Sequence, residues 1–259
     1  MVRLAITGAA GRMGARIIEL ASQDSRLQVV AALEAANHPK LGQTIAPGVK
    51  LTDRVETDFD VMIEFSHPDA TLGWLDAVLK AGKRIVIGTT GHRPDQVEKI
   101  TRAAQRIAAI RAANMSVGVN TLLRIVGEVA KVLGPDYDIE IVEGHHRFKK
   151  DAPSGTALTL ADAICKALGK TPAAALVHGR QGREALRQTG TIGMHAVRLG
   201  DTVGEHEVFY GTVGETISIK HSAHTRDTFV NGALRAALWL ADKPAGLYSM
   251  QDVLFGDQR

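Results

Sequence analysis

The first thirty-three residues place a glycine-spaced turn between two short apolar runs, and this pattern limits the fold more than any other feature of the chain. Leu4–Thr7 is an apolar run that stops at the turn Gly8–Gly14, where glycine recurs at every third position. Apolar residues then fall at helical spacing, and a second apolar run follows at Leu27–Leu33. A buried run, a glycine turn, a helix and another buried run predict a βαβ unit.

The same alternation continues to about residue 110. Residues 37–57 contain two prolines and two glycines, which predicts loop or weak strand. Beyond them, further strands are predicted at Val61–Phe65, Arg84–Gly88 and Ile107–Ile110, with helices that begin at Pro68 and Pro94. Strands that alternate with helices predict an α/β fold with a Rossmann-type, doubly wound parallel sheet.

After Asn114 the pattern changes to longer helices and runs of strands. The strictly alternating stretch Thr216–Lys220 is typical of a sheet with one covered face. Helices are predicted at Val119–Leu133, Ser154–Leu168 and Thr228–Leu240, and strands at Ile139–Val142, Gly190–Val197, Glu205–Gly211 and Glu215–His221. The second half is therefore predicted to be an α+β domain with a mixed or antiparallel sheet.

Composition excludes several classes of protein. Hydrophobic residues make up 45% and charged residues 23% of the 259-residue chain, which argues against disorder. The net charge of +3 and the 4% of aromatic residues argue against a nucleic-acid partner. The single cysteine, Cys165, permits no internal disulfide and is expected to be a small buried apolar residue. No apolar stretch approaches the ~18 residues of a membrane span, so we expect no membrane contact and a cytoplasmic location.

The glycine turn predicts a dinucleotide site. Glycine lets the backbone approach a pyrophosphate, and the following helix points its N-terminal N–H groups at the negative charge. Glu34 ends the second strand where an acidic residue can bind ribose hydroxyls. The spacing differs from the common G-x-G-x-x-G form, because Ala10 takes the middle position, and such turns also occur for packing alone. Gly88–Gly91 and Ala112–Met115 follow two further strands, at the edge where such sheets bind ligands.

The densest chemistry lies in Glu143–Thr156. Five potential cations occupy six positions from His145 to Lys150, and a Ser-Gly-Thr sequence follows at a predicted helix start. This combination predicts a receptor for carboxylate or phosphate beside a titratable histidine and lysine. Three other interpretations stay open: a metal site at His145 and His146, which lacks the usual ligand spacing; a solvated basic loop; and a simple helix cap. His67, His92, His178, His195 and His206 are expected to be surface or hydrogen-bonded histidines.

With these motifs in hand, the chain resembles the dihydrodipicolinate reductase family over essentially its whole length. The most specific motif is Glu143–Ala157, and four others support it in order: Gly8–Gly14, Gly88–Thr90, Ala112–Asn120 and Val203–His206. The resemblance implies an oxidoreductase of lysine and diaminopimelate biosynthesis. Its reaction is the reduction of 4-hydroxy-tetrahydrodipicolinate, a cyclic dicarboxylate, to tetrahydrodipicolinate by NADH or NADPH, with loss of water.

The resemblance also implies roles for single residues. His145 is expected to be the acid/base residue, Lys149 the proton donor, and His146, Gly155 and Thr156 the contacts to a substrate carboxylate. No metal is expected. The cofactor shell is expected to comprise Gly8, Ala9, Ala10, Gly11, Arg12, Met13, Glu34, Gly88, Thr89, Thr90, Ala112, Ala113, Asn114 and Met115.

The resemblance further implies how the chain is divided. Residues 1–116 and 227–259 are expected to form the dinucleotide-binding domain, and residues 117–226 the domain for substrate binding and oligomerisation. A homotetramer is expected to form through the sheet of the second domain.

Some residues depart from the family pattern. Ala35 stands where members that accept NADPH readily often carry arginine, and Glu34 repels a 2′-phosphate, so we expect a preference for NADH. Phe148 and Met115 replace residues that are often polar and aromatic, respectively. Two other functions are weighed against the reductase: a relative that reduces a different imine or aldehyde, and a non-enzymatic dinucleotide sensor. The His-His-x-x-Lys run argues against the first. His145, Lys149 and Thr156 argue against the second, because a sensor needs no proton donor beside an anion site.

Overall fold

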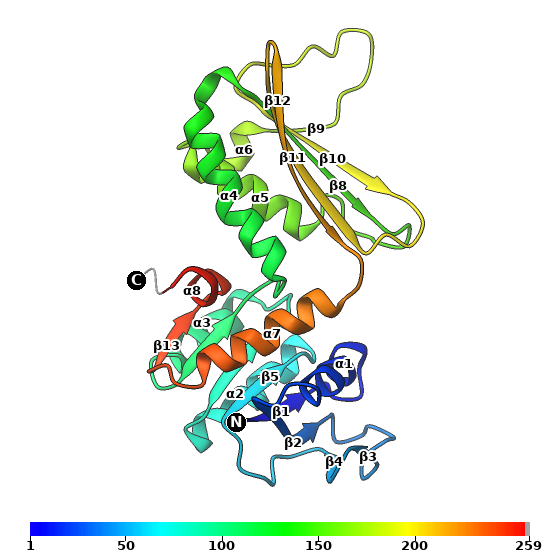
Figure 1. Ribbon diagram of the computed structural model, residues 1–259, viewed down its shortest axis with the longest axis vertical. Coiled ribbons are helices and arrows are strands. Elements are labelled where there is room, and N and C mark those ends of the chain that lie inside the picture. The colour runs from blue at the N-terminus through cyan, green and yellow to red at the C-terminus, as the bar shows by residue number, and fades with distance from the viewer. Residues whose placement is uncertain (257–259) are drawn as a thin grey trace. The chain divides into compact units, whose positions relative to one another are not determined.

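The computed structural model describes residues 1–256, which divide into two compact units (Figure 1). Unit 1 comprises Met1–Val117 and the chain from Asp227 onward, and unit 2 comprises Gly118–Arg226. The division falls one residue after the predicted boundary at 116, and the predicted first domain extends to residues 257–259, which lie outside the described residues. The chain leaves and re-enters unit 1 at neighbouring points, because Ser116 Oγ lies 2.7 Å from Thr228 Oγ1.

Unit 1 is built on one sheet whose strands are mostly parallel. Its strands are β1 (Val2–Thr7), β2 (Leu27–Leu33), β3 (Thr44–Ala46), β4 (Val49–Thr52), β5 (Val61–Glu64), β6 (Arg84–Ile87), β7 (Ala108–Arg111) and β13 (Gly246–Tyr248). Within residues 1–256 they lie in the order β13-β7-β6-β5-β1-β2-β4-β3. Each adjacent pair is parallel except β3 with β4. The predicted doubly wound parallel sheet is confirmed.

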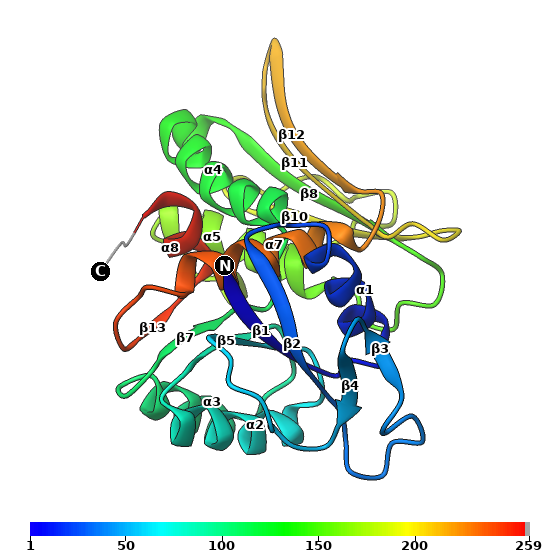
Figure 2. The ribbon, with the colours of Figure 1, turned by 60° about the horizontal axis from the view of Figure 1, so that its bottom comes forward.

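Helices cover both faces of this sheet (Figure 2). They are α1 (Arg12–Ala21), α2 (Pro68–Ala81), α3 (Pro94–Ala103), α7 (Asp227–Leu240) and α8 (Met250–Phe255). Leu4 and Ile6 of β1 pack with α1, α7 and α8, whereas Ala5 packs on the opposite face with α2 and α3. Because successive side chains of a strand point to opposite faces, the continuous apolar run of β1 fills both cores.

Local signals fix where the helices of unit 1 begin and end. The His67 side chain caps α2, Pro68 takes its first turn, and Gly82 ends it at a positive φ of 61°. Proline fits the first turn because a backbone N–H at that position would have no partner within the helix, so its absence costs nothing. Glycine adopts the left-handed conformation without a Cβ clash. Pro94 begins α3 in the same way.

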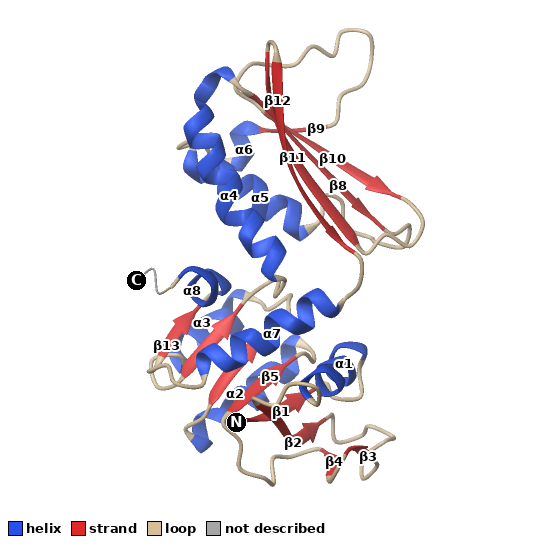
Figure 3. Ribbon diagram, viewed as in Figure 1, coloured by secondary structure: helices blue, strands red, loops and turns tan. Residues whose placement is uncertain are grey.

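Unit 2 packs two long helices against one face of a mixed sheet (Figure 3). Its elements are α4 (Val117–Leu133), a short 3₁₀ turn (Gly134–Asp136), β8 (Asp138–His145), α5 (Gly155–Ala167), α6 (Pro172–Ala175), β9 (Leu176–His178), β10 (Ile192–Arg198), β11 (Gly204–Thr212) and β12 (Glu215–Ala223). The described strands follow the order β12-β11-β8-β10-β9, in which β9, β10 and β8 are parallel and β11 and β12 antiparallel. The predicted α+β domain with a mixed sheet is confirmed.

The differences from the predicted elements are short. Residues 37–57, predicted to be loop or weak strand, contain β3 and β4. Four further short elements were not predicted: β9, β13, α6 and α8. Strands of three residues carry too little sequence pattern to be recognised, since pairing with a distant strand decides them. Cys165 is fully buried in the core of unit 2, as predicted. Within residues 1–256, no helix combines the length and the apolar character needed to cross a bilayer.

Candidate functional site

The glycine turn joins β1 to α1 in unit 1. Gly8 has a φ of +63°, and a Cβ there would lie 2.1 Å from the carbonyl oxygen of Phe65. A Cβ at Gly14 would lie 2.2 Å from the carbonyl oxygen of Gly8. Both positions therefore exclude any side chain. Gly11 is the N-cap of α1 and supplies no side-chain cap, and the first turn of this helix contains no acidic residue. The helix N-terminus can therefore receive an anion.

A cavity of about 710 Å³ opens beside this turn. Its wall includes Gly8, Gly11, Glu34, Ala35, Arg54, Phe65, Ser66, His67 and Trp74. Glu34 follows β2, and its carboxylate accepts hydrogen bonds from the N–H groups of Ala10 and Ala35, each at 3.2 Å. The predicted turn and the predicted acidic residue thus meet at one cavity. The volume of this cavity falls within the range of about 300–1,000 Å³ that is usual for small-molecule and cofactor sites.

The loops after β5 and β6 lie at the same edge of the sheet. A Cβ at Gly88 would lie 2.2 Å from the Phe65 ring, so the ring closes over this glycine. The Thr89 hydroxyl accepts a hydrogen bond from the Ser66 N–H at 2.9 Å, and the N–H and the hydroxyl of Ser66 both donate to the buried carboxylate of Glu64. Gly88 and Thr89 are therefore fixed by the neighbouring loop. Thr90 is exposed.

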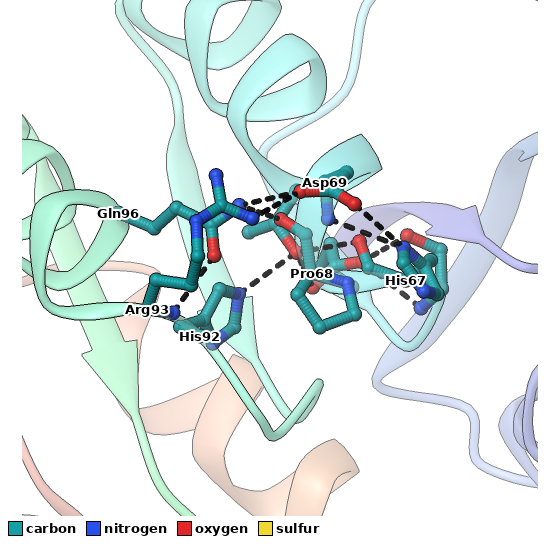
Figure 4. A network of polar contacts seen from close by, with 9 residues as sticks. His67, Pro68, Asp69, His92, Arg93 and Gln96 are labelled. Atoms are coloured by element: carbon teal, nitrogen blue, oxygen red, sulfur yellow. Dashed lines mark hydrogen bonds and ion pairs between the residues drawn. The ribbon is translucent and has the colours of Figure 1, made fainter.

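A second polar network ties the starts of α2 and α3 together (Figure 4). Gln96 Nε2 donates to the Pro68 carbonyl at 3.1 Å and to Asp69 Oδ1 at 3.0 Å, and Arg93 Nη1 lies 2.8 Å from Asp69 Oδ1. His92 Nε2 lies 3.0 Å from Thr71 Oγ1. Burial lowers the pKa of His92, so its ring is held neutral. These bonds hold the N-terminus of α2, next to the cavity residue His67, against the N-terminus of α3.

The third predicted segment follows β7. The Ala112 N–H donates to the Ile87 carbonyl at 3.2 Å, which places this segment beside the end of β6. Asn114 Oδ1 accepts the Ser116 N–H at 2.8 Å, and Met115 is buried against α7. The three predicted cofactor segments thus follow β1, β6 and β7 of one sheet, in which β5 separates β1 from β6; among residues 1–256, only the first of the three segments lines the cavity.

The predicted substrate segment lies in unit 2, where β8 ends. His145 is the last residue of β8 and is 9% exposed. Its Nδ1 lies 2.5 Å from Oε2 of the fully buried Glu143. Burial lowers the pKa of His145, and Glu143 opposes that shift. The net effect favours the neutral imidazole, which can accept a proton from a ligand.

Lys149 and the start of α5 complete this cluster. Lys149 Nζ forms an ion pair with Asp151 Oδ1 at 2.9 Å, and the Lys149 N–H donates to the His146 carbonyl at 3.1 Å. Ser154 caps α5 by accepting the Ala157 N–H at 3.2 Å. Gly155 and Thr156 form the first turn of α5, which contains no acidic residue. Cations and a helix N-terminus together suit a carboxylate ligand. The helix-cap interpretation of Ser154 is also correct.

Sequence reasoning assigned no role to three residues of this cluster, Glu143, Arg198 and His206. Arg198 Nη1 and Nη2 donate to the two oxygens of Glu143 at 2.9 and 2.8 Å. His206 is 4% exposed, and its Nε2 lies 3.2 Å from Ser154 Oγ. Burial lowers the pKa of His206 to about 4. Glu143 and His206 stood inside recognised motifs, which was the available signal. Nothing local in the sequence marked Arg198.

Metal binding has no support from the geometry of the cluster. Within the described part of the chain, no three histidine, cysteine or carboxylate residues are grouped to hold an ion. His145 and His146 are adjacent in sequence, and the imidazole of His145 is instead engaged with Glu143 and faces the ring of His206 edge-on at 5.2 Å.

Comparison with known proteins covers both units. Residues 2–115 match the family model described as dihydrodipicolinate reductase, N-terminus, and residues 118–254 match the model for the C-terminus of the same family. The chain is 46% identical to the 4-hydroxy-tetrahydrodipicolinate reductase of Hahella chejuensis, over 98% of this chain and 99% of that protein. It is 44% identical to the enzyme of the same name from Nitrosospira multiformis, over 98% and 97% of the two chains.

A solved structure gives the same fold. A dipicolinate-bound dihydrodipicolinate reductase from Paenisporosarcina sp. TG-14 superposes with a TM-score of 0.80 at 24% sequence identity, covering 97% of this chain and 98% of that one. The resemblance deduced from the motifs is confirmed along the whole chain, and the protein belongs to the dihydrodipicolinate reductase family.

Proposed function

We propose that this protein reduces 4-hydroxy-tetrahydrodipicolinate to tetrahydrodipicolinate, using one NAD(P)H and one proton and releasing one water. The observation that carries the proposal is identity of about 45% to reductases of this name over nearly the full length of both chains. The geometry agrees, because unit 1 contains a glycine-lined cavity and unit 2 contains a cationic cluster beside a helix N-terminus.

Unit 1 is proposed to hold the nucleotide. Gly8–Met13 and the N-terminus of α1 would receive the pyrophosphate, Glu34 the ribose hydroxyls, and Gly88–Thr90 with Ala112–Met115 the nicotinamide end. No side chain fits at Gly8, and the absence of a side chain there would let the backbone approach the phosphates. When bound, the reduced nicotinamide supplies the hydride.

Unit 2 is proposed to hold the dicarboxylate and supply the proton. His146, Gly155 and Thr156 would bind a carboxylate, while His145 and Lys149 would deliver the proton that quenches the negative charge left by hydride addition to a conjugated imine. General acid–base groups contribute roughly 10²–10⁴-fold each to turnover.

The experiment mixes the purified protein, NADH and the freshly generated condensation product of pyruvate and aspartate semialdehyde, and follows loss of the reduced-nicotinamide absorbance. His145→Ala and Lys149→Ala should each lower kcat by about 10²-fold or more while NADH binding is unchanged. Lys150→Ala, an exposed neighbour, is the matched control and should retain wild-type turnover. A wild type that consumes no NADH, or that prefers another imine or an aldehyde, contradicts the proposal.

NADH is proposed as the preferred cofactor. Glu34 lines the cavity and Ala35 offers no cation beside it, so a 2′-phosphate would meet a carboxylate. Arg54 also lines the cavity, but its Nε lies 2.8 Å from Glu56 Oε1. The ratio of kcat/KM for the two cofactors tests this point, and a tenfold advantage for NADPH would refute it.

A homotetramer that associates through the sheet of unit 2 is proposed as the assembly. β12 is an edge strand of the sheet, and most of its N-terminal half is exposed, including Ile217. The unpaired backbone groups of an exposed edge strand favour pairing with another copy. Light scattering should give four times the 27.7 kDa chain mass, and a monomer at micromolar concentration would exclude this assembly. A cytoplasmic location remains the expectation from the sequence.

A further inference from the structure

Glu143 is a fully buried carboxylate at the centre of the unit 2 cluster, and its surroundings are more specific than packing requires. Four hydrogen bonds reach it from three directions. Oε1 accepts the Ser154 N–H at 3.0 Å and Arg198 Nη2 at 2.8 Å, and Oε2 accepts Arg198 Nη1 at 2.9 Å and lies 2.5 Å from His145 Nδ1. Such bidentate, charge-assisted pairing is what a buried carboxylate needs to remain ionised.

The charge state of Glu143 decides which nitrogen of His145 carries a proton. Burial alone would raise the pKa of Glu143, but Arg198, His145 and the Ser154 N–H together hold it below its ordinary value. An ionised carboxylate can only accept hydrogen bonds. Nδ1 of His145 must therefore donate, and Nε2 is the nitrogen left to exchange a proton.

The surroundings of Nε2 agree with this division. A Cβ at Gly204 would lie 3.2 Å from Nε2, so a glycine keeps this side of the ring clear of any side chain. The charged or titratable groups that face His145 are Glu143 on its own strand, Arg198 on β10, His206 on β11 and Lys149 in the following loop. Of these, only Glu143 lies within hydrogen-bond distance of the ring.

We propose that Glu143, held by Arg198, is the positioning residue of the reductase: it fixes His145 in the Nδ1–H form, so that Nε2 alone exchanges the proton with substrate. This inference rests on the proposed function of the cluster. Through the Ser154 N–H the same carboxylate also holds the start of α5, so one buried charge sets both the imidazole and the helix N-terminus proposed to bind a carboxylate.

Glu143→Gln tests the inference because it replaces one acceptor by a donor. An amide oxygen at the Oε1 position keeps the acceptor for the Ser154 N–H and Arg198 Nη2. The amide nitrogen then takes the place of Oε2, where it gives up the hydrogen bond from Arg198 Nη1 and donates to Nδ1 of His145. The variant should therefore invert the tautomer and leave the proton on Nε2. Nitrogen-15 NMR of full-length protein labelled at histidine reports the tautomer directly, with His145→Asn to assign the signal.

The expected results are an Nδ1–H imidazole in the wild type, an Nε2–H imidazole in Glu143→Gln, and a fall in kcat of about 10²-fold or more with an unchanged KM for NADH. Glu140→Gln is the matched control, since Glu140 lies on the same strand and pairs with His195 Nε2 at 2.7 Å outside the cluster. It should change neither the His145 signal nor turnover.

Two results would overturn the inference: a wild-type His145 protonated on Nε2, or a folded Glu143→Gln variant with kcat within threefold of wild type. The wild-type spectrum shows which nitrogen of His145 carries the proton, even if Glu143→Gln does not fold. Failure of the proposed function is a separate result, because it is the absence of NADH consumption by the wild type, whereas the tautomer is measured without substrate.

Discussion

At the scale of single residues, the choice between the two cofactors depends on the side chains beside Glu34. An arginine at position 35 would present a planar, permanently charged fork to a 2′-phosphate, and this is the feature that Ala35 lacks. Ala35→Arg should raise kcat/KM for NADPH by about 10-fold or more, the size of a charge-assisted hydrogen bond of ~1.5–3 kcal/mol, and leave that for NADH within a few-fold. Ala36→Arg, at the next cavity residue, is the control for added charge alone.

A second prediction at this scale concerns His206 and the pH dependence of the free energy of unfolding. Its folded pKa is about 4 because it is buried, whereas an unfolded histidine titrates near ~6.5. Between these values the unfolded chain binds the extra proton, so stability is lost as pH falls from 6.5 toward 4, by at most on the order of 3 kcal/mol from this group. Thermal melts in this range should show a shallower loss for His206→Gln. Identical slopes for the two proteins would contradict the argument.

At the scale of elements, the junction of β1 and α1 is the most constrained connection in unit 1. A side chain at Gly8 would meet both a positive φ and the Phe65 carbonyl, so Gly8→Ala should lower the free energy of unfolding by roughly 1–3 kcal/mol. Gly73 sits inside α2 with no atom within 4 Å of its missing Cβ, and Gly73→Ala should instead stabilise by about 0.5–1 kcal/mol. Urea denaturation of the two variants gives the comparison. Equal changes in the free energy of unfolding would show that the contact between a Cβ at Gly8 and the Phe65 carbonyl does not destabilise the fold.

The elements also show what can be predicted from the sequence and why. The apolar runs of β1, β2 and β5 and the proline and glycine boundaries of α2 are local signals, and they predicted the parallel sheet. Helix α8 was missed although Ser249 and Asp252 form a capping box at its start, a signal present in the sequence. Strand β13 exists because it pairs with β7, far earlier in the chain, and no local pattern marks it.

The same distinction holds in the unit 2 cluster. His145, Lys149 and the start of α5 lie close together in sequence, so their chemistry could be predicted. Arg198 meets Glu143 only because β10 pairs with β8 in a register that puts it opposite His145. A charge partner supplied by strand register cannot be found from spacing along one chain.

At the scale of the whole molecule, the arrangement of the chain is discontinuous: unit 2 is an insertion between two parts of unit 1. Contacts close the ends of unit 1 around the insertion. Arg16 forms a two-point ion pair with Asp227 at 2.8 and 2.7 Å, and Gly232 of α7 passes so close to the Met115 carbonyl that a Cβ there would lie 1.7 Å from it. Unit 1 therefore has its own sheet, its own cores and the cavity beside the glycine turn.

The contact between Ser116 and Thr228 has a practical consequence, because it allows nucleotide binding to be studied apart from catalysis. Residues 118–226 can be excised and the cut ends rejoined through a few glycines and serines, leaving a miniature dinucleotide carrier. Trp74, in the cavity wall, should still transfer excitation energy to NADH in this shortened chain, although the chain can no longer turn over. A truncated chain that unfolds or gives no such transfer would mean that the inserted half is needed to build the nucleotide receptor itself.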